Sequence, residues 1–132
     1  PVADVARELA AARDAALAAG VAPAAIVLDP GLGFAKRSAD SLAVLRGLPR
    51  LAALGRPLLV GASRKRFVGE LSGVADPAER VHGSVGAHVA ALARGARLFR
   101  VHDVRAHREA LDVAWAVLRG TDAGVRPAGA RD

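Results

Sequence analysis

The sequence predicts an α/β fold in which short parallel strands alternate with helices. Three apolar runs, IVL, LLV and LFRV, each stop in a polar or glycine-rich stretch, and each is followed by a helical pattern. This repeated order of strand, loop and helix is typical of parallel β/α architectures. Because the carboxyl ends of such strands carry the functional side chains, we expect Asp29, Lys65, Arg100 and His102 to converge on one site.

The length of the chain limits the number of β/α units. A closed eight-stranded β/α barrel needs about 250 residues, whereas this chain has 132, which is enough for three units. The sequence therefore predicts either a small open-sheet domain or one part of a larger barrel. Residues 121–132, rich in Gly, Ala, Pro and Arg, are predicted to form a flexible tail.

The first half is predicted to contain a long helix, a strand and two shorter helices. Residues 3–19 have one apolar helical face and are followed by Gly20, a residue suited to a helix C-terminus. The unbroken apolar run at 24–28 is typical of a strand that is covered on both faces. Ser38 is suited to cap the next helix, and Pro49 to occupy the first turn of a short one. The apolar face of the first helix consists of Val5, Leu9, Ala12 and Ala16.

The second half is predicted to repeat the order of strand and helix. Asp76 is suited to cap a long helix, and Gly73 and Gly120 are suited to end two others. Gly83 and Gly86 are predicted to allow close packing of the long helix. The predicted elements are a strand at 58–62, a helix at 67–71, a helix at 77–95, a strand at 96–102 and a helix at 103–119.

The composition favours a soluble, cytoplasmic protein that binds anions rather than nucleic acid. The chain has no Cys, so neither a disulfide framework nor a thiolate zinc site is predicted. No uncharged stretch reaches the roughly 18 apolar residues of a membrane helix, and the N-terminus lacks the plan of a secretion signal. The formal net charge of +6 comes from scattered arginines, and aromatic residues make up only 3%. Neither a basic stripe nor a base-stacking platform is therefore predicted.

The DPGLGFAK motif places a carboxylate at the end of the first predicted strand. A buried Asp29 would accept two N–H donors from an amino-heterocycle, and Gly31 and Gly33 permit backbone conformations that other residues resist. Taken alone, a D-P-G sequence is more often a turn or a helix cap than a binding site. Likewise Phe34 is more often a packing residue, and Lys36 a solvated charge.

The next two strand ends carry cations. In GASRKR, side chains that alternate cannot all face one way, so at most two of the three cations would enter a pocket. In RVHDV, Arg100 and His102 would share one strand face and Val101 the other. An Arg in an apolar strand needs an anionic partner, which is either a carboxylate, from Asp29 or Asp103, or a phosphate or diphosphate group. The other histidines, His82, His88 and His107, are predicted to be solvated or capping residues.

Together, the motifs resemble the C-terminal half of dihydropteroate synthases. DPGLGFAK at 29–36, LLVGASRKRFVGEL at 58–71, ERVHGS at 79–84 and FRVHDV at 99–104 follow that family's order. The resemblance implies a pterin-binding TIM (β/α)8 barrel, with residues 1–120 as its last three β/α units and hence an incomplete domain. It also implies folate biosynthesis, in which p-aminobenzoate is joined to 6-hydroxymethyl-7,8-dihydropterin diphosphate and pyrophosphate is released.

The resemblance assigns roles to residues that match its motifs. Asp29 would hold the amino and ring nitrogens of the pterin. Lys65 would hydrogen-bond the pterin, and Gly61 would supply a carbonyl group to it. Arg100 would stack on the pterin and, with His102, bind the leaving diphosphate, so that Lys65, Arg100 and His102 are the catalytic candidates.

Further parts of the site follow from the same resemblance. Phe34 and Arg66 would border the p-aminobenzoate pocket, where sulfonamides compete, although some members of the family have Ser in place of Arg66. The Asn that helps to bind Mg²⁺ and two mobile loops belong to the family's N-terminal half. That half, or another copy of the chain, would cover the exposed strands. The resemblance also implies a homodimer, because the family is commonly dimeric through its late helices. The isolated chain is therefore expected to be catalytically inactive or nearly so.

Two other functions are compatible with the sequence. One is a different pterin-binding barrel of the methyltransferase type, although such a ligand has no diphosphate for the SRKR and RVHD cations to neutralise. The other is a non-catalytic remnant or binding module. Diphosphate-enhanced pterin binding would favour a synthase over a methyltransferase-type barrel, and loss of all pterin binding would favour the remnant.

Overall fold

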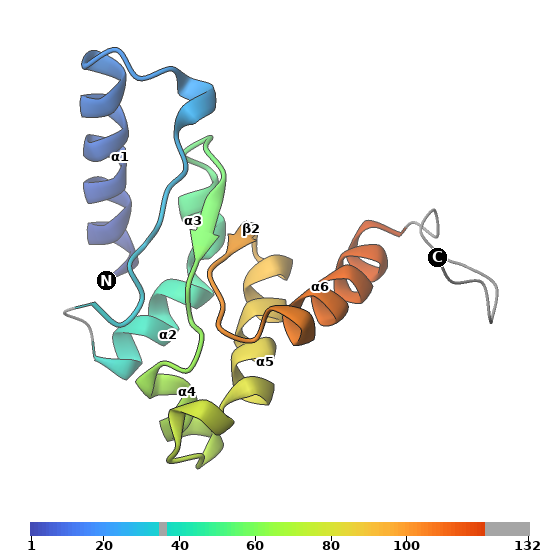
Figure 1. The fold of residues 1–132 in the computed structure, drawn as a ribbon. Coiled ribbons are helices and arrows are strands. Elements are labelled where there is room, and N and C mark those ends of the chain that lie inside the picture. The colour runs from blue at the N-terminus through green and yellow to red at the C-terminus, as the bar shows by residue number, and fades with distance from the viewer. Residues whose placement is uncertain (35–36, 121–132) are drawn as a thin grey trace.

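In the second half of the chain, short strands and helices alternate as predicted, whereas only helices precede the first strand among the described residues (Figure 1). The computed structural model describes residues 1–34 and 37–120. The predicted tail at 121–132 and Lys36 lie outside the described residues. The elements are α1 (Val2–Ala18), the 3₁₀ helix η1 (Pro23–Ala25), α2 (Ser38–Arg46), α3 (Leu48–Ala52), β1 (Leu58–Val60), α4 (Arg66–Ser72), the 3₁₀ helix η2 (Pro77–Glu79), α5 (Val81–Ala93), β2 (Ala96–Phe99) and α6 (Val104–Arg119).

The sheet in the described residues has two parallel strands, β1 and β2. The prediction of a full strand at 24–28 is wrong, because only Leu28 makes a parallel bridge, to Leu58. Pro23 starts a 3₁₀ turn in which the Ile26 N–H donates to the Pro23 carbonyl at 3.1 Å. The first two residues of the apolar run, Ala24 and Ala25, therefore belong to this turn. The remaining extended segment runs beside β1, with β2 on the other side of β1 (Figure 1).

A register shift in the sheet reverses the side-chain alternation of β2. Leu58 lies opposite Ala96, and both are buried. Val60 lies opposite Phe99, so β2 contains one extra residue at Arg97. Such a β-bulge moves every later residue of the strand to the other face. The residue that follows Phe99 therefore lies on the face opposite to Ala96.

The core lies between the strands and a continuous outer layer of helices (Figure 1). In this layer α1 packs on α2 and α3, α2 on α4, α4 on α5, and α5 on α6. The predicted apolar face of the first helix is confirmed for Val5, which is buried, but Ala12 is exposed. The least exposed apolar side chains of the core are those of Leu32, Val44, Leu48, Leu51, Leu58, Val60, Ala62, Ala91 and Ala96.

Two helix boundaries differ from the prediction. Ser38 is the first residue of α2 and not its cap; Arg37 occupies the cap position, and its N–H donates to the Asp40 carboxylate at 3.3 Å. The helix predicted at 77–95 is divided into η2 and α5, with Arg80 between them. Arg80 has φ of −87° and ψ of 26°, outside the helical range.

Several local predictions are confirmed. Gly73 and Gly120 end α4 and α6 in the left-handed region, with φ of 75° and 65°. Gly83 allows close packing, since a Cβ there would lie 2.6 Å from Val68 of α4. The same prediction for Gly86 is wrong, because a Cβ there would meet nothing within 4 Å. None of the helices in the described segments is long and apolar enough to cross a membrane.

Candidate functional site

Asp29 and Arg100 form an ion pair across the ends of two strand segments. Asp29 follows the residue that bridges to β1, and Arg100 directly follows β2. Arg100 Nη2 donates to Asp29 Oδ2 at 2.6 Å, while Asp29 Oδ1 accepts the Gly31 N–H at 2.9 Å. Gly31 has a φ of 69°, which glycine adopts readily. Of the two carboxylates considered for Arg100, Asp29 is the partner.

The bulge in β2 and a glycine in the neighbouring segment bring Arg100 into this position. The Arg100 N–H still donates to the Val60 carbonyl at 3.1 Å, as part of the strand ladder. A Cβ at Gly61 would lie 3.1 Å from Arg100 Nη1, tighter than an ordinary van der Waals contact. Gly61 therefore allows the guanidinium to lie against the backbone at the end of β1.

His102 lies on the loop beyond β2 and not on a strand. Its Nδ1 lies 2.7 Å from Ser63 Oγ, and its backbone N–H donates to the same oxygen at 3.1 Å. Since β2 ends at Phe99, the predicted strand alternation of Arg100, Val101 and His102 does not apply to this loop. Val101 lines a pocket of about 130 Å³ together with Gly61, Ser63, Lys65, Arg100 and His102.

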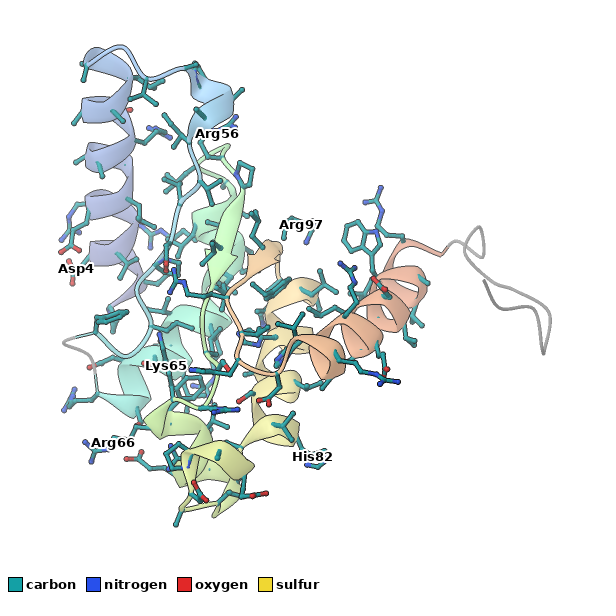
Figure 2. All side chains as sticks on the ribbon, in the orientation of Figure 1. Asp4, Arg56, Lys65, Arg66, His82 and Arg97 are labelled. Carbon is teal, nitrogen blue, oxygen red and sulfur yellow. The ribbon has the colours of Figure 1, made fainter. Side chains whose placement is uncertain are left out.

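The three adjacent cations of the SRKR motif point in three directions, consistent with the predicted limit of two in one pocket. Arg64 pairs with Asp103, with Nη2 3.1 Å from Oδ1. Lys65 Nζ donates to the Leu32 carbonyl. Arg66 pairs with Glu70 at 2.7 Å and reaches outward from α4, whereas Lys65 lies in the middle of the molecule (Figure 2). Lys65 is therefore the cation of this motif that the fold directs to the Asp29 segment.

A second, larger pocket of about 390 Å³ is also lined by Lys65. Lys65 Nζ lies 4.9 Å from the centre of the Phe34 ring, which is a cation–π distance. Phe34 is itself 69% exposed, so its ring is not a core residue. The lining residues are Gly33, Arg37, Ser38, Ser41, Lys65, Arg66, Phe67 and Glu70.

A clamp that the sequence analysis missed holds the backbone of Arg64. Arg64 has a φ of 59°, the only positive φ of a non-glycine residue among those described. Its N–H donates to Ser84 Oγ at 2.9 Å, and its carbonyl accepts from Arg80 Nη1 at 2.9 Å. Arg80 also donates to the carbonyls of Val74 and Ala75. The ERVHGS motif therefore supports the loop that carries Lys65.

Two histidines behind the site are buried, so the prediction that they are solvated or capping is wrong. His88 is 0% exposed and His107 is 2% exposed. Burial, with the neighbouring titratable groups of His107 and Lys65 as smaller causes, lowers the pKa of His88 to about 4. His82 is exposed, as predicted (Figure 2). Helical spacing alone did not distinguish these environments.

Positive charge dominates the electrostatics of the site. The carboxylates at its rim are already paired, Asp29 with Arg100 and Asp103 with Arg64. The Arg64 hydrogen bond lowers the pKa of Asp103 below its ordinary value. Within residues 1–34 and 37–120, no group of three or more His, Asp or Glu side chains could hold a metal ion. The geometry suits an anion next to a group that offers N–H donors to Asp29.

The sequence of residues 1–102 matches the model of one protein family, described as pterin binding enzyme. The chain belongs to this family. Among curated members, it is 52% identical over 120 residues to a dihydropteroate synthase of Neisseria meningitidis serogroup B, covering 89% of this chain and 42% of that protein. It is also 41% identical over 118 residues to the inactive dihydropteroate synthase 2 of Mycobacterium leprae, covering 89% and 40%.

Solved structures of pterin-binding enzymes have the same fold. The dihydropteroate synthase of Thermus thermophilus in complex with 6HMPPP superposes with a TM-score of 0.84 at 59% identity, covering 88% of this chain and 46% of that one. The enzyme of Xanthomonas albilineans in complex with 7,8-dihydropteroate gives a TM-score of 0.87 at 48% identity, covering 91% and 45%. This chain therefore spans less than half the length of these relatives.

Proposed function

We propose that this chain forms the pterin and diphosphate part of a dihydropteroate synthase active site. In this proposal residues 1–120 are the last three β/α units of a TIM barrel. The proposal depends chiefly on one observation, the meeting of Asp29 with Arg100 beside Lys65 at the strand ends. Structures of relatives that bind 6HMPPP and dihydropteroate at 48% identity or more support the ligand class.

Each residue of the proposed site has a chemical role. The Asp29 carboxylate accepts hydrogen bonds from the pterin's amino and ring N–H groups, and the Gly61 carbonyl and Lys65 contact the same ring. Arg100 presents a flat guanidinium, which suits stacking on the pterin and binding of diphosphate oxygens. His102, held by Ser63, lines the same pocket and binds the diphosphate.

The proposed reaction requires positioning and charge stabilisation rather than a protein nucleophile. The C–O bond between the pterin methylene and the diphosphate breaks, and its electron pair leaves with the diphosphate. The amine nitrogen of p-aminobenzoate forms the new C–N bond and then loses a proton to solvent. Lys65, Arg100 and His102 are the catalytic candidates because they stabilise negative charge on the departing group.

The remaining parts of the proposal concern groups outside this pocket. Arg66 lines the second pocket, and the Phe34 ring lies beside Lys65, another of its lining residues. We assign this region to p-aminobenzoate and to competing sulfonamides. The described residues do not form a metal site; the proposed Mg²⁺ would be held by the diphosphate and by an Asn from the other half of the barrel. No step above depends on that ion. A cytoplasmic location and a homodimer complete the proposal.

Calorimetric titration of the purified chain with pterin diphosphate and Mg²⁺ tests the proposal. We expect binding that weakens at least about tenfold in Arg100→Ala, because charge-assisted hydrogen bonds are lost. Arg105→Ala, which removes an exposed arginine of α6, is the matched control. The absence of binding by a cooperatively folded chain would contradict the proposal. We expect little or no condensation by the isolated chain, and measurable condensation would overturn that expectation.

Asp29→Asn is expected to weaken the binding of the pterin without weakening the binding of diphosphate. The amide cannot supply two anionic acceptors, so the affinity for pterin diphosphate should fall at least about tenfold. Affinity for inorganic pyrophosphate should stay the same or rise, since Arg100 loses its carboxylate partner. Parallel titrations with both ligands measure this difference, with the exposed Glu8→Gln as a control. Equal losses for both ligands would contradict the assigned role of Asp29.

A pterin-binding protein without synthase activity is the second candidate. The observation that favours it is the 41% identity to an inactive dihydropteroate synthase 2. Such a protein would bind pterin but would not condense it with p-aminobenzoate when the rest of a barrel is supplied. A pterin without diphosphate that binds as tightly as the diphosphate form would instead favour the methyltransferase type.

A further inference from the structure

A line of hydrogen bonds runs through the buried histidines behind the proposed site. The Ala62 N–H donates to His88 Nε2 at 2.9 Å. His88 Nδ1 lies 2.9 Å from His107 Nε2, and His107 Nδ1 lies 2.8 Å from the Asp103 carbonyl oxygen. The line therefore connects the loop after β1 with the start of α6.

The two ends of this line determine where the ring protons are. A backbone N–H can only donate, so His88 Nε2 must accept, and the ring proton of His88 must be on Nδ1. A carbonyl can only accept, so His107 Nδ1 must donate, and its Nε2 is the acceptor for His88. Both ends of the line therefore require His88 Nδ1 to donate its hydrogen bond to His107 Nε2. A second proton on either ring would place two donors against each other, so the arrangement requires both rings to be neutral.

Residues adjacent in the chain complete this line as a closed circuit of contacts that passes through the proposed site. Ala62 is followed by Ser63, whose hydroxyl holds His102 through both its ring and its backbone. His102 is followed by Asp103, whose carbonyl receives the His107 hydrogen bond. The circuit of contacts therefore includes both loops that line the 130 Å³ pocket. His88 and His107 are almost completely buried, so water cannot easily replace either hydrogen bond.

We propose that His88 and His107 are positioning residues, which together fix the Ala62–Ser63 loop against His102 and so preorganise the pocket for diphosphate. This inference rests on the proposed function. The two rings touch no ligand themselves; they act through Ser63 and His102. The edge contact of His88 with Phe99, with ring centres 5.4 Å apart, holds the ring in place beneath β2.

The ring protons can be tested without any ligand. Ring nitrogen NMR shifts of the chain at pH 7 should show both His88 and His107 as neutral Nδ1–H tautomers, whereas exposed His82 should show the common Nε2–H form. An Nε2–H tautomer or a charged ring at either buried position would overturn the inference.

The effect on binding is tested with three variants and inorganic pyrophosphate or pterin diphosphate as probes. His88→Leu removes both hydrogen bonds and should weaken binding about tenfold. His88→Gln, whose side-chain oxygen reaches the Ala62 N–H, should recover most of that loss, and His82→Leu should bind like the unmodified chain. If the unmodified chain binds neither probe, the proposed function fails and this inference with it. If His88→Leu is folded and binds normally, only the inference fails.

Discussion

Acidification from pH 7.5 to pH 4 is expected to lower the free energy of unfolding by about 3 kcal/mol through His88 alone. Burial lowers the pKa of His88 from its ordinary value of 6.5 to about 4 in the folded chain. Between these values the unfolded chain binds the proton and the folded chain does not, so stability falls as the pH falls. The slope should be about 1.4 kcal/mol per pH unit. Urea unfolding at several pH values measures it.

His88→Gln is the variant that identifies the source of this pH dependence. The glutamine amide does not titrate. Between pH 6.5 and pH 4, the slope of the free energy of unfolding against pH should therefore be smaller in the variant by the contribution of about one proton. The other titratable groups that contribute to the lowered pKa of His88 are His107 and Lys65, and the variant changes neither of them. The pKa values of Asp40, Glu70, Asp103 and Asp112 are lowered, so these carboxylates lose their stabilising effect mainly at more acidic pH. Identical slopes for the His88→Gln variant and the unmodified chain, or an equal change in a His82→Gln control, would contradict the prediction.

Arg80→Ala is expected to lower the free energy of unfolding by about 3 kcal/mol. The guanidinium donates to the carbonyls of Arg64, Val74 and Ala75, each at 2.9 Å. The lysine ammonium lacks the planar geometry with which a guanidinium binds three carbonyls at once. Arg80→Lys should therefore recover only part of the lost stability. Chemical unfolding at pH 7 measures the effect. The Arg64 amide should also exchange its hydrogen faster, because Arg64 is then held only through Ser84.

Gly69→Ala provides a matched test that displaces the Arg80 side chain without replacing the residue. A Cβ at Gly69 would lie 2.4 Å from the guanidinium, so the arginine must move from its carbonyl partners. We expect a smaller loss of about 1–2 kcal/mol in the same direction. The exposed pair of Arg105 with Glu109 serves as a control, since Arg105→Ala should cost less than about 0.5 kcal/mol. An Arg80→Ala loss as small as this control would show that the clamp contributes little to stability.

Much of the fold was predictable because its signals are local. The strands predicted at 58–62 and 96–102 are present but shorter, at Leu58–Val60 and Ala96–Phe99, and Gly73 and Gly120 end helices with positive φ. The strand prediction at 24–28 was wrong because an apolar pattern cannot show which residues form hydrogen bonds to a neighbouring strand. Only Leu28 finds one among the described residues.

The candidate site was predictable only in outline. Polar residues after parallel strands predicted that Asp29 and Arg100 would meet, and they do, at 2.6 Å. Helical spacing could not show that His88 is fully buried, because its hydrogen-bond partners come from the loop after β1 and from α6. Nor could a local pattern show that Arg80 supports Arg64, 16 residues earlier in the chain.

The amino-acid sequence by itself determined the order of most strands and helices. It also determined which residues make up the pterin-binding motifs and that the strand ends carry cations. These properties depend on neighbouring residues, so they can be read without knowing the packing. Only the tertiary structure decided that the β2 bulge turns Arg100 toward Asp29, and that two buried histidines connect the loops behind the pocket. Both depend on contacts between residues far apart in the chain, where side-chain volume and hydrogen-bond geometry determine the outcome.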